Sequence, residues 1–427
     1  MSKNKRNPKK MIISRVYLLL LMFVMSCASA PVKFTTAQNS DNLNQGSIKQ
    51  ESYFQKIPYQ NIDGWLIVPV SINGKTYNFC FDTGAPLTIS DKILRELNLP
   101  IIRQEKIEDL SGRREEMRVI LLPELHLHGI TFIDTPGLVF NEESSESVDH
   151  LECYGIDGFI GSNMLRNSAV QIDEQSKHII ITNNVGRLSI EKKIYQYMEL
   201  DPDQSCPFIK IRFHKGEQVL YDRKVVFDTG AAGSFYRMKI DSYNWCNDND
   251  CAGLINKITE SEGSFALSAH GTNEKQQHLL LNIPKLNING TIFNNVVTYT
   301  TNGSTSIIGS KLLEYGKVTL DFINKRFYFE AFDNIKTDDL SKRPWAIGPT
   351  WRNGKLVVGI IWDKKLESQI NLGDEVLSIN GIDISSMSLC EYENRPSPNK
   401  TSSNEEQILE LRDIKTGKIK PITIKRL

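Results

Sequence analysis

The chain has 427 residues, of which 40% are hydrophobic and 24% are charged, as in folded globular proteins. This length is too great for one ordinary hydrophobic core, so it predicts two or three domains. Because its 51 basic and 51 acidic side chains balance, the overall charge excludes a general electrostatic attraction to nucleic acid.

The amino terminus has the pattern of an export signal. A basic segment precedes the apolar run Val16–Val24, which has the length of a signal-peptide core and is too short to span a bilayer. Two processing sites compete. Ala28–Ala30 fits ordinary signal cleavage, whereas Val24–Cys27 resembles a bacterial lipobox, in which Cys27 becomes the lipid-bearing first residue. Either site predicts export to the cell envelope, as a cleaved secreted form or as a periplasmic or surface lipoprotein.

Two segments of the chain repeat the same succession of predicted elements. The first copy begins with a strand from Trp65, an Asn-Gly hairpin turn and a second strand that enters the sequence FDTGA at Phe81–Ala85. It continues with the strand Leu122–Phe132, the apolar pair and glycine of Phe159–Gly161, and a strand that ends at Asp173.

The second copy follows in the same order. A strand from Phe208 and a Lys-Gly turn lead into FDTGA at Phe227–Ala231, and the later elements are Ile283–Phe293, Ile307–Gly309 and a strand ending at Asp321. The motif aspartate precedes the glycine of the apolar pair by 79 residues in the first copy and 81 in the second. Chance similarity does not preserve register in this way, so the sequence predicts two copies of one β-rich lobe.

These motifs resemble those of the aspartic proteases. The resemblance rests on FDTGA at Phe81–Ala85 and Phe227–Ala231, each followed by a hydrophobic-hydrophobic-Gly element, and it covers about residues 60–332. It implies an all-β fold of two pseudo-symmetric lobes whose motif loops face each other across a cleft. Each lobe then supplies one carboxylate, Asp82 or Asp228, to a single active site.

In this family two neighbouring carboxyl groups share one proton, because two carboxylates about 3 Å apart do not both ionise at low cost. The ionised member takes a proton from a bound water while the neutral one donates to the scissile carbonyl. By resemblance, Asp82 and Asp228 hold this water, and Thr83 and Thr229 form hydrogen bonds across the lobe interface. The other residues that the resemblance assigns to the motif loops or to the packing behind them are Gly84, Ala85, Gly230, Ala231, Ile160, Gly161, Ile308 and Gly309.

Two features depart from the pepsin pattern. Ala85 and Ala231 stand where pepsin-like enzymes carry a hydroxyl residue. The lack of a hydroxyl that donates to the carboxylate predicts a pH optimum nearer neutral, as in retroviral-type proteases. No tyrosine stands where a pepsin-like flap is expected. Instead, Leu110–Arg113 and Leu267–Gly271 predict one small flap from each lobe, as in a retropepsin-like dimer fused into one chain.

An exported location decides how the cysteines are interpreted. Cys246 and Cys251 enclose four polar residues and are expected to form a local disulfide, with two free thiols as the alternative. His126 and His128 lie two apart on a predicted strand, but their counterparts in the second copy are asparagines, so neither a metal nor a cofactor is expected. No pairing follows from the sequence for the remaining cysteines, which are Cys80, Cys153, Cys206 and Cys390.

The last part of the chain resembles a PDZ domain over about residues 345–427. Asn371–Ile382 combines Gly-Asp, an apolar strand and Asn-Gly in the order typical of these domains, and Leu356–Ile361 predicts a buried strand. PDZ domains bind chain ends by strand addition and through the N–H groups of a loop, for which Ala346–Thr350 is the candidate. Pro349 has no N–H to donate, which argues against capture of a carboxylate. Docking of a substrate or partner peptide and packing on the protease as a cover both remain open.

The sequence therefore predicts an exported aspartic endopeptidase that acts on a peptide or protein substrate and has no nucleic-acid partner. Its alternative is a non-catalytic envelope protein that binds peptides in the cleft and a partner through the PDZ-like domain. The equal spacing of the motifs and the short joint between the copies favour pairing of the lobes within one chain. The predicted segments are a signal peptide at 1–30, a tether at 31–58, the first lobe at 59–185, the second lobe at 186–332 and the C-terminal domain at 345–427.

Overall fold

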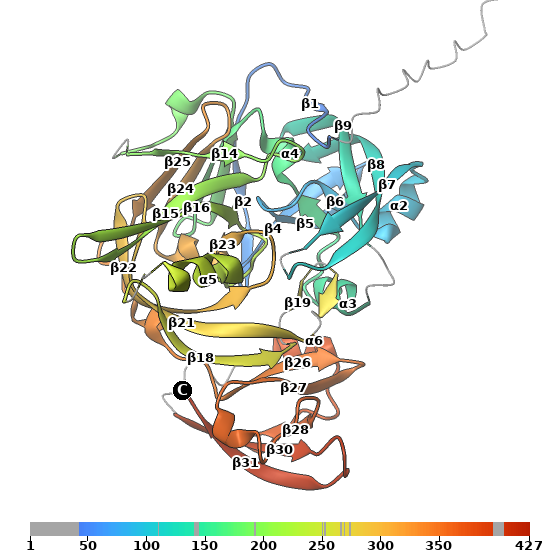
Figure 1. Cartoon of the computed structure of the whole chain (residues 1–427). Helices are drawn as coiled ribbons and strands as arrows, with labels where there is room; N and C mark the ends of the chain where they lie inside the picture. Colours follow the sequence, from blue (N-terminus) through green and yellow to red (C-terminus); the bar gives the residue numbers. More distant parts are fainter. Residues whose placement is uncertain are drawn as a thin grey trace, which may run out of the picture. The chain divides into compact units, whose positions relative to one another are not determined.

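The computed structural model of this protein describes residues 42–427 except for 110, 141–144, 192–193, 250, 252, 265–266, 269, 273–274 and 396–404 (Figure 1). The predicted signal peptide and Cys27 lie outside the described residues. The described part of the chain consists mainly of β-strands, which confirms the predicted all-β fold. Among its helices, none has the length and apolar composition needed to cross a membrane.

The first lobe is built on a nine-stranded sheet with the order β1-β9-β6-β10-β5-β4-β8-β7, in which β3 also pairs with β4 and β8 with β9. Asn73 and Gly74 have positive φ angles of 49° and 76°, as a two-residue hairpin turn between β4 and β5 requires. The elements of this lobe and of the segment before it are β1 (Ser47–Ile48), β2 (Phe54–Pro58), β3 (Gln60–Ile62), β4 (Trp65–Ile72), β5 (Lys75–Phe81), β6 (Thr88–Ile89), α2 (Asp91–Leu97), β7 (Ile101–Glu108), β8 (Arg114–Leu127), β9 (Ile130–Val139), α3 (Ser145–Cys153), β10 (Gly158–Ile160), α4 (Ser162–Leu165), β11 (Ala169–Asp173), β12 (His178–Thr182) and the 3₁₀ helix η2 (Val185–Arg187).

The second lobe repeats the arrangement around its motif. β16 pairs in parallel with β23, which pairs antiparallel with β17, just as β5, β10 and β6 do in the first lobe. The elements of the second lobe are β13 (Gln196–Tyr197), β14 (Glu199–Leu200), β15 (Pro207–Lys215), β16 (Gln218–Asp228), β17 (Tyr236–Lys239), α5 (Ile240–Asp248), β18 (Asn256–Gly263), β19 (Leu267–Ser268), β20 (Gly271–Thr272), β21 (Gln276–Ile288), β22 (Thr291–Thr301), β23 (Ser306–Gly309), the 3₁₀ helix η3 (Ser310–Glu314), β24 (Gly316–Asp321) and β25 (Arg326–Ala331).

A six-stranded sheet joins the two lobes. Its order is β13-β25-β24-β11-β12-β2, so the strands that close each copy of the repeat pair with one another. At its centre β11 and β24 run antiparallel, with Val170 opposite Leu320. Both of these side chains are fully buried in one hydrophobic core that includes residues of both lobes. The lobes are therefore held together by backbone hydrogen bonds as well as by side-chain packing.

The tether predicted over residues 31–58 is wrong for its second half. β1 pairs with β9 of the first lobe, and β2 pairs with β12 of the six-stranded sheet. Leu43 and Ile57 are 2% and 1% exposed. These residues belong to the fold because strand pairing and two buried apolar side chains outweigh the polar composition that suggested a linker.

The C-terminal domain has its own hydrophobic core and is joined to the second lobe by its sheet. A 14-stranded sheet runs from β14 through β18 into β27, where Gly263 of β18 pairs with Ile360 of β27 (Figure 1). The prediction of a carboxylate-binding loop at Ala346–Thr350 is wrong, because most of these residues belong to β26 and pair with β27. The remaining elements of the chain are η4 (Asp338–Ser341), β26 (Ile347–Arg352), β27 (Lys355–Ile361), η5 (Lys364–Leu366), β28 (Glu375–Ile379), β29 (Ile382–Asp383), α6 (Leu389–Asn394), β30 (Glu406–Arg412) and β31 (Ile419–Lys425), where η marks 3₁₀ helices.

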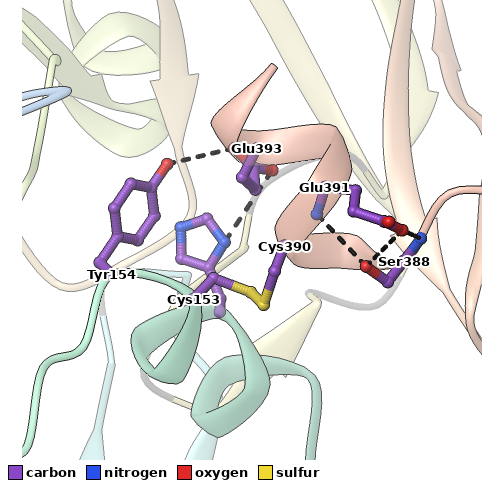
Figure 2. Close-up of a disulfide and its surroundings, with 7 residues drawn as sticks. Cys153, Tyr154, Ser388, Cys390, Glu391 and Glu393 are labelled. Atoms are coloured by element: carbon purple, nitrogen blue, oxygen red, sulfur yellow. Dashed lines mark hydrogen bonds and ion pairs between the residues drawn. A yellow bond between two sulfur atoms is a disulfide. The ribbon is translucent and has the colours of Figure 1, made fainter.

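Two disulfides cross-link the described residues. Cys246 and Cys251 form the local one at the end of α5. Figure 2 shows the other, between Cys153 at the end of α3 in the first lobe and Cys390 of α6 in the C-terminal domain. Beside it, the Tyr154 hydroxyl donates to Glu393 at 3.2 Å, so a polar contact accompanies the covalent one. Cys80 and Cys206 are free and buried.

The two histidines of the predicted strand do not share a face. β8 ends at Leu127, so His128 is the first residue of a hairpin turn, with a φ angle of 46°. Its counterpart Asn289 has a φ angle of 48° in the same kind of turn. The repeat therefore requires left-handed backbone at this position, a conformation that asparagine and histidine adopt more readily than most residues. His126 contacts Thr131 and Glu124 instead.

Candidate active site

The first motif loop leaves the sheet at the end of β5. The backbone N–H of Asp82 donates to the carbonyl of Ile160 on the parallel neighbour β10, at 3.0 Å. The chain then turns sharply, and the N–H groups of Gly84 and Ala85 donate to Asp82 Oδ1 at 2.8 and 3.1 Å. The strand thus fixes the backbone of Asp82, and the turn fixes its carboxylate.

The second motif loop has the same geometry at the end of β16. The N–H groups of Gly230 and Ala231 donate to Asp228 Oδ1 at 2.8 and 3.2 Å. Asp82 and Asp228 are 5% and 3% exposed, so both carboxyl groups are buried. Each loop therefore presents one carboxyl group whose outer oxygen remains available for another partner.

The threonines of the two motifs cross-connect the loops. The Thr83 hydroxyl donates to the carbonyl of Phe227 and the Thr229 hydroxyl to the carbonyl of Phe81, both at 2.6 Å. Each threonine N–H in turn donates to the hydroxyl of the other threonine at 3.1 Å. Both side chains are completely buried, so these four hydrogen bonds form a rigid link between the loops.

The motif glycines allow the two carboxyl groups to approach each other. A Cβ on Gly84 would overlap the carboxyl group of Asp228, and a Cβ on Gly230 would overlap that of Asp82. Each glycine thus lies against the carboxylate of the opposite lobe. The structure brings Asp82, Asp228 and both Thr-Gly pairs together at one point.

The apolar pairs lie directly behind the loops. Ile160 and Ile308 are completely buried in the common core. A Cβ on Gly161 would overlap the backbone of Pro86 and Leu87, and one on Gly309 would overlap the carbonyls of Ala231 and Ser234. Close packing of backbone on backbone therefore supports each motif loop from below.

The two carboxyl groups are hydrogen-bonded to each other and titrate as a pair. Burial raises the pKa of both, and the neighbouring Asp228 carboxylate raises the pKa of Asp82 further. For Asp228, the hydrogen bond from Asp82, the motif N–H groups and the charge of Arg237 act in the opposite direction and lower the pKa. The pair therefore retains a proton to higher pH than an exposed carboxyl group does.

The two expected flap tips touch each other. The first is the turn between β7 and β8, in which Asp109 Oδ1 accepts hydrogen bonds from Ser111 and from the N–H of Arg113. The second is the β19–β20 ribbon, where the N–H of His270 donates to Asp109 Oδ2 at 3.2 Å. Leu110 and Ala269 of these tips lie outside the described residues. The hairpins of the two lobes are thus linked by one buried carboxylate.

Sequence reasoning missed two features of the structure, one of them next to the second motif loop. Arg237, on the strand that follows the second motif, is close enough to Asp228 for its charge to act on that carboxyl group. Its signal is a lone cation in the otherwise apolar stretch Phe235–Met238. The Cys153–Cys390 disulfide has no such signal, because its pairing depends on how the C-terminal domain docks.

Comparison with known proteins bears on this site. The sequence model of the family described as aspartyl protease matches residues 68–164, which contain the first motif loop and β10. Among solved structures, a retropepsin-like aspartic protease from Rickettsia conorii matches at 17% identity and a TM-score of 0.22, over 32% of this chain and 94% of that one. No curated protein matches the chain. The family match, together with the second motif loop that lies opposite the first, supports an aspartic protease.

Proposed function

We propose that this protein is an aspartic endopeptidase that hydrolyses peptide bonds with a water molecule activated between Asp82 and Asp228. The observation that carries the proposal is the mutual fit of the two loops, in which each motif glycine lies against the carboxyl group of the other lobe. A loop kept only for folding would not need two buried carboxyl groups in contact, because their burial is unfavourable.

One proton shared by the pair gives the two carboxyl groups complementary roles. The ionised member accepts a proton from the water as the water attacks the scissile carbonyl. The neutral member donates its proton to the carbonyl oxygen, and a tetrahedral intermediate forms without a covalent bond to the enzyme. The motif N–H groups keep both carboxylates oriented through this exchange.

The test is cleavage of a diverse peptide mixture by the purified protein between pH 3 and pH 8, beside Asp82→Asn and Asp228→Asn. We expect cleavage by the wild type and its loss in either variant. Activity that survives in one of the variants would contradict a shared dyad. A folded wild-type protein that cleaves nothing at any pH would favour the non-catalytic, peptide-binding alternative.

We further propose that the C-terminal domain, which is PDZ-like in sequence, is a fixed docking platform of the protease. Its support is the Cys153–Cys390 disulfide, the β18–β27 pairing, and Leu280 of the second lobe packed against Ile360 and Trp362. Titration of the full chain with peptides that have free or amidated carboxyl ends, after Asp82→Asn removes cleavage, tests for a ligand. If no peptide binds outside the cleft, the domain is instead a structural cover that packs on the protease lobes.

Export to the cell envelope is also proposed, with lipid attachment at Cys27 as one of the two processing routes. The two disulfides support an oxidising compartment, because such bonds persist outside the cytoplasm. Incorporation of labelled fatty acid into the wild type and into Cys27→Ser distinguishes the routes. Equal labelling of both proteins would exclude acylation of Cys27.

A further inference from the structure

Arg237 projects from β17, the strand that follows the second motif, away from the hydrophobic core. Its neighbours on β17, Tyr236 and Met238, are 2% and 1% exposed and belong to the common core. Since successive side chains of a strand point to opposite faces, Arg237 points to the other side of the sheet. There its side chain is half-buried.

The side chain of Arg237 lies on the face of the sheet that is next to the second motif loop. In the paired strands Arg237 lies opposite Ile307, and Ile307 lies opposite Val226, two residues before Asp228. Directly opposite residues of paired strands have their side chains on the same face. Val226 and Ile307 cluster there with Ala231 of the motif, so the Arg237 side chain emerges beside the catalytic loop.

The guanidinium group has a buried hydrogen-bond donor that the protein does not use. Its carbon lies 5.1 Å from the centre of the Tyr299 ring, which places the cation over an aromatic face. Its Nε is buried and has no hydrogen-bond partner, and within the described part of the chain no acidic side chain forms an ion pair with it. A buried donor of this kind is unfavourable unless a ligand supplies the acceptor.

The corresponding position of the first lobe is neutral and already satisfied. Thr88 lies opposite Phe159, as Arg237 lies opposite Ile307. Thr88 is 3% exposed, and its hydroxyl donates to the carbonyl of Pro86 at 3.1 Å. The two lobes thus differ at equivalent places beside the dyad. The first lobe has a threonine whose hydroxyl is already hydrogen-bonded, and the second has an arginine with a donor that lacks a partner.

We propose that Arg237 makes the second lobe a binding site for a substrate carboxylate close to the scissile bond. This inference rests on the proposed protease function and names its substrate class. A guanidinium fork matches a carboxylate with two parallel hydrogen bonds. The charge of Arg237 also offsets the repulsion between an acidic substrate and the ionised dyad. The carboxylate is that of an aspartate or glutamate side chain or of a chain end.

Matched peptides test the proposal with the full-length protein. A peptide cut by the wild type is resynthesised with Glu or Gln at each position that flanks the cut, and with a free or amidated carboxyl end. At one position we expect the wild type to prefer Glu over Gln by about 10- to 100-fold in kcat/KM, the range of a charge-assisted hydrogen bond. Arg237→Gln brings this ratio close to one, and Arg237→Lys retains part of it. The matched control in the first lobe, Thr88→Val, keeps the wild-type ratio.

The outcomes separate the possible sources of the carboxylate. A preference for Glu at one internal position identifies a side chain, and a preference for the free over the amidated end identifies a chain end. A wild type that treats all matched pairs alike overturns the proposal. So does Arg237→Gln if it slows acidic and neutral peptides equally, because that is the result of a structural role alone.

A binding measurement makes this test independent of catalysis. The dissociation constants of the same Glu and Gln peptides are measured with Asp82→Asn and with Asp82→Asn combined with Arg237→Gln. We expect tighter binding of the acidic peptide only where Arg237 is present. A preference in binding without cleavage by the wild type would preserve the inference and reject the protease function, whereas no preference in binding would reject the inference itself.

Discussion

The two lobes are nearly identical where the dyad is built and different immediately beside it. The N–H of each motif glycine donates to its aspartate at 2.8 Å in both lobes, and each threonine hydroxyl donates across the interface at 2.6 Å in both. This symmetry follows from the chemistry, because a proton can be shared only when both carboxyl groups are held to within a fraction of an ångström.

The residues packed beside the motif loops follow no such constraint. In the first lobe Phe159 contacts Phe140 and Trp65 with ring centres 5.0 and 6.5 Å away. In the second lobe its counterpart Ile307 lies between Val226 and Arg237. One lobe thus has an aromatic cluster beside its motif loop, and the other has a smaller apolar cluster beside a cation. The two copies thus share the geometry of the motif loops, whereas the residues packed beside these loops differ.

The largest effect is expected from substitution of either dyad aspartate, the feature that is alike in the two lobes. Asp82→Asn and Asp228→Asn should each lower kcat by about 10²- to 10⁴-fold, because each removes one of two coupled proton-transfer groups. Initial rates on a fluorogenic peptide measure this loss. The exposed Asp248→Asn is the control that keeps the wild-type rate. A large difference between the two dyad variants would show that the lobes are not equivalent in catalysis.

The cross-connecting threonines should contribute equally from both lobes. Thr83→Val and Thr229→Val each leave buried N–H and C=O groups without a partner, which should lower the free energy of unfolding by about 2–4 kcal/mol. Urea denaturation followed by tryptophan fluorescence measures it. Thr88→Val, which loses one hydrogen bond within its own lobe, should cost only about 1 kcal/mol. Unequal losses at Thr83 and Thr229 would contradict the symmetry of the link.

The raised pKa of the dyad predicts how stability depends on pH. Burial and the neighbouring Asp228 raise the pKa of Asp82 in the folded protein above its reference value of 3.8, so the protonated form contributes stability at low pH. It is lost as the pH rises from about 4 through the higher pKa of the folded state. Relative to the wild type, Asp82→Asn should therefore gain stability as the pH rises from 4 to 7. A difference that stays constant over this range would exclude a raised pKa.

The smallest expected effect concerns the alanines that follow each DTG. Ala85→Ser and Ala231→Ser introduce hydroxyls that can donate to the carboxylates, so each should lower the pH optimum, by less than about one unit. The wild-type optimum is expected nearer neutral than that of pepsin. The pH dependence of kcat/KM checks both statements. A wild-type rate that peaks below about pH 3 would contradict the role assigned to Ala85 and Ala231.

Much of the site could be predicted because its signals are local and occur twice. FDTGA fixes a turn whose N–H groups face its own aspartate, and the matched spacing of the two copies predicts that the loops pair. The remaining features depend on contacts that no local pattern encodes. The sequence of β2 does not show the alternation of a half-buried strand. Only Ile57 of its five residues is buried, and its place in the sheet depends on pairing with β12.

Three further features could not be predicted from the sequence for similar physical reasons. The turn at His128 is hidden within an apolar alternation that otherwise predicts a continuous strand, and only the backbone angle reveals it. The partner of Cys153 could not be deduced, because it lies 237 residues away in another domain. Arg237 was visible in sequence, but its meaning required the face on which its side chain emerges.

The long-range disulfide also changes what a break in the chain would mean. A single cut between Cys153 and Asp228 separates Asp82 from Asp228 along the polypeptide but leaves the two fragments covalently joined. The protein can therefore persist as a nicked, two-chain molecule whose halves each carry one carboxyl group. Such a molecule would run as one species on a non-reducing gel and as two on a reducing one.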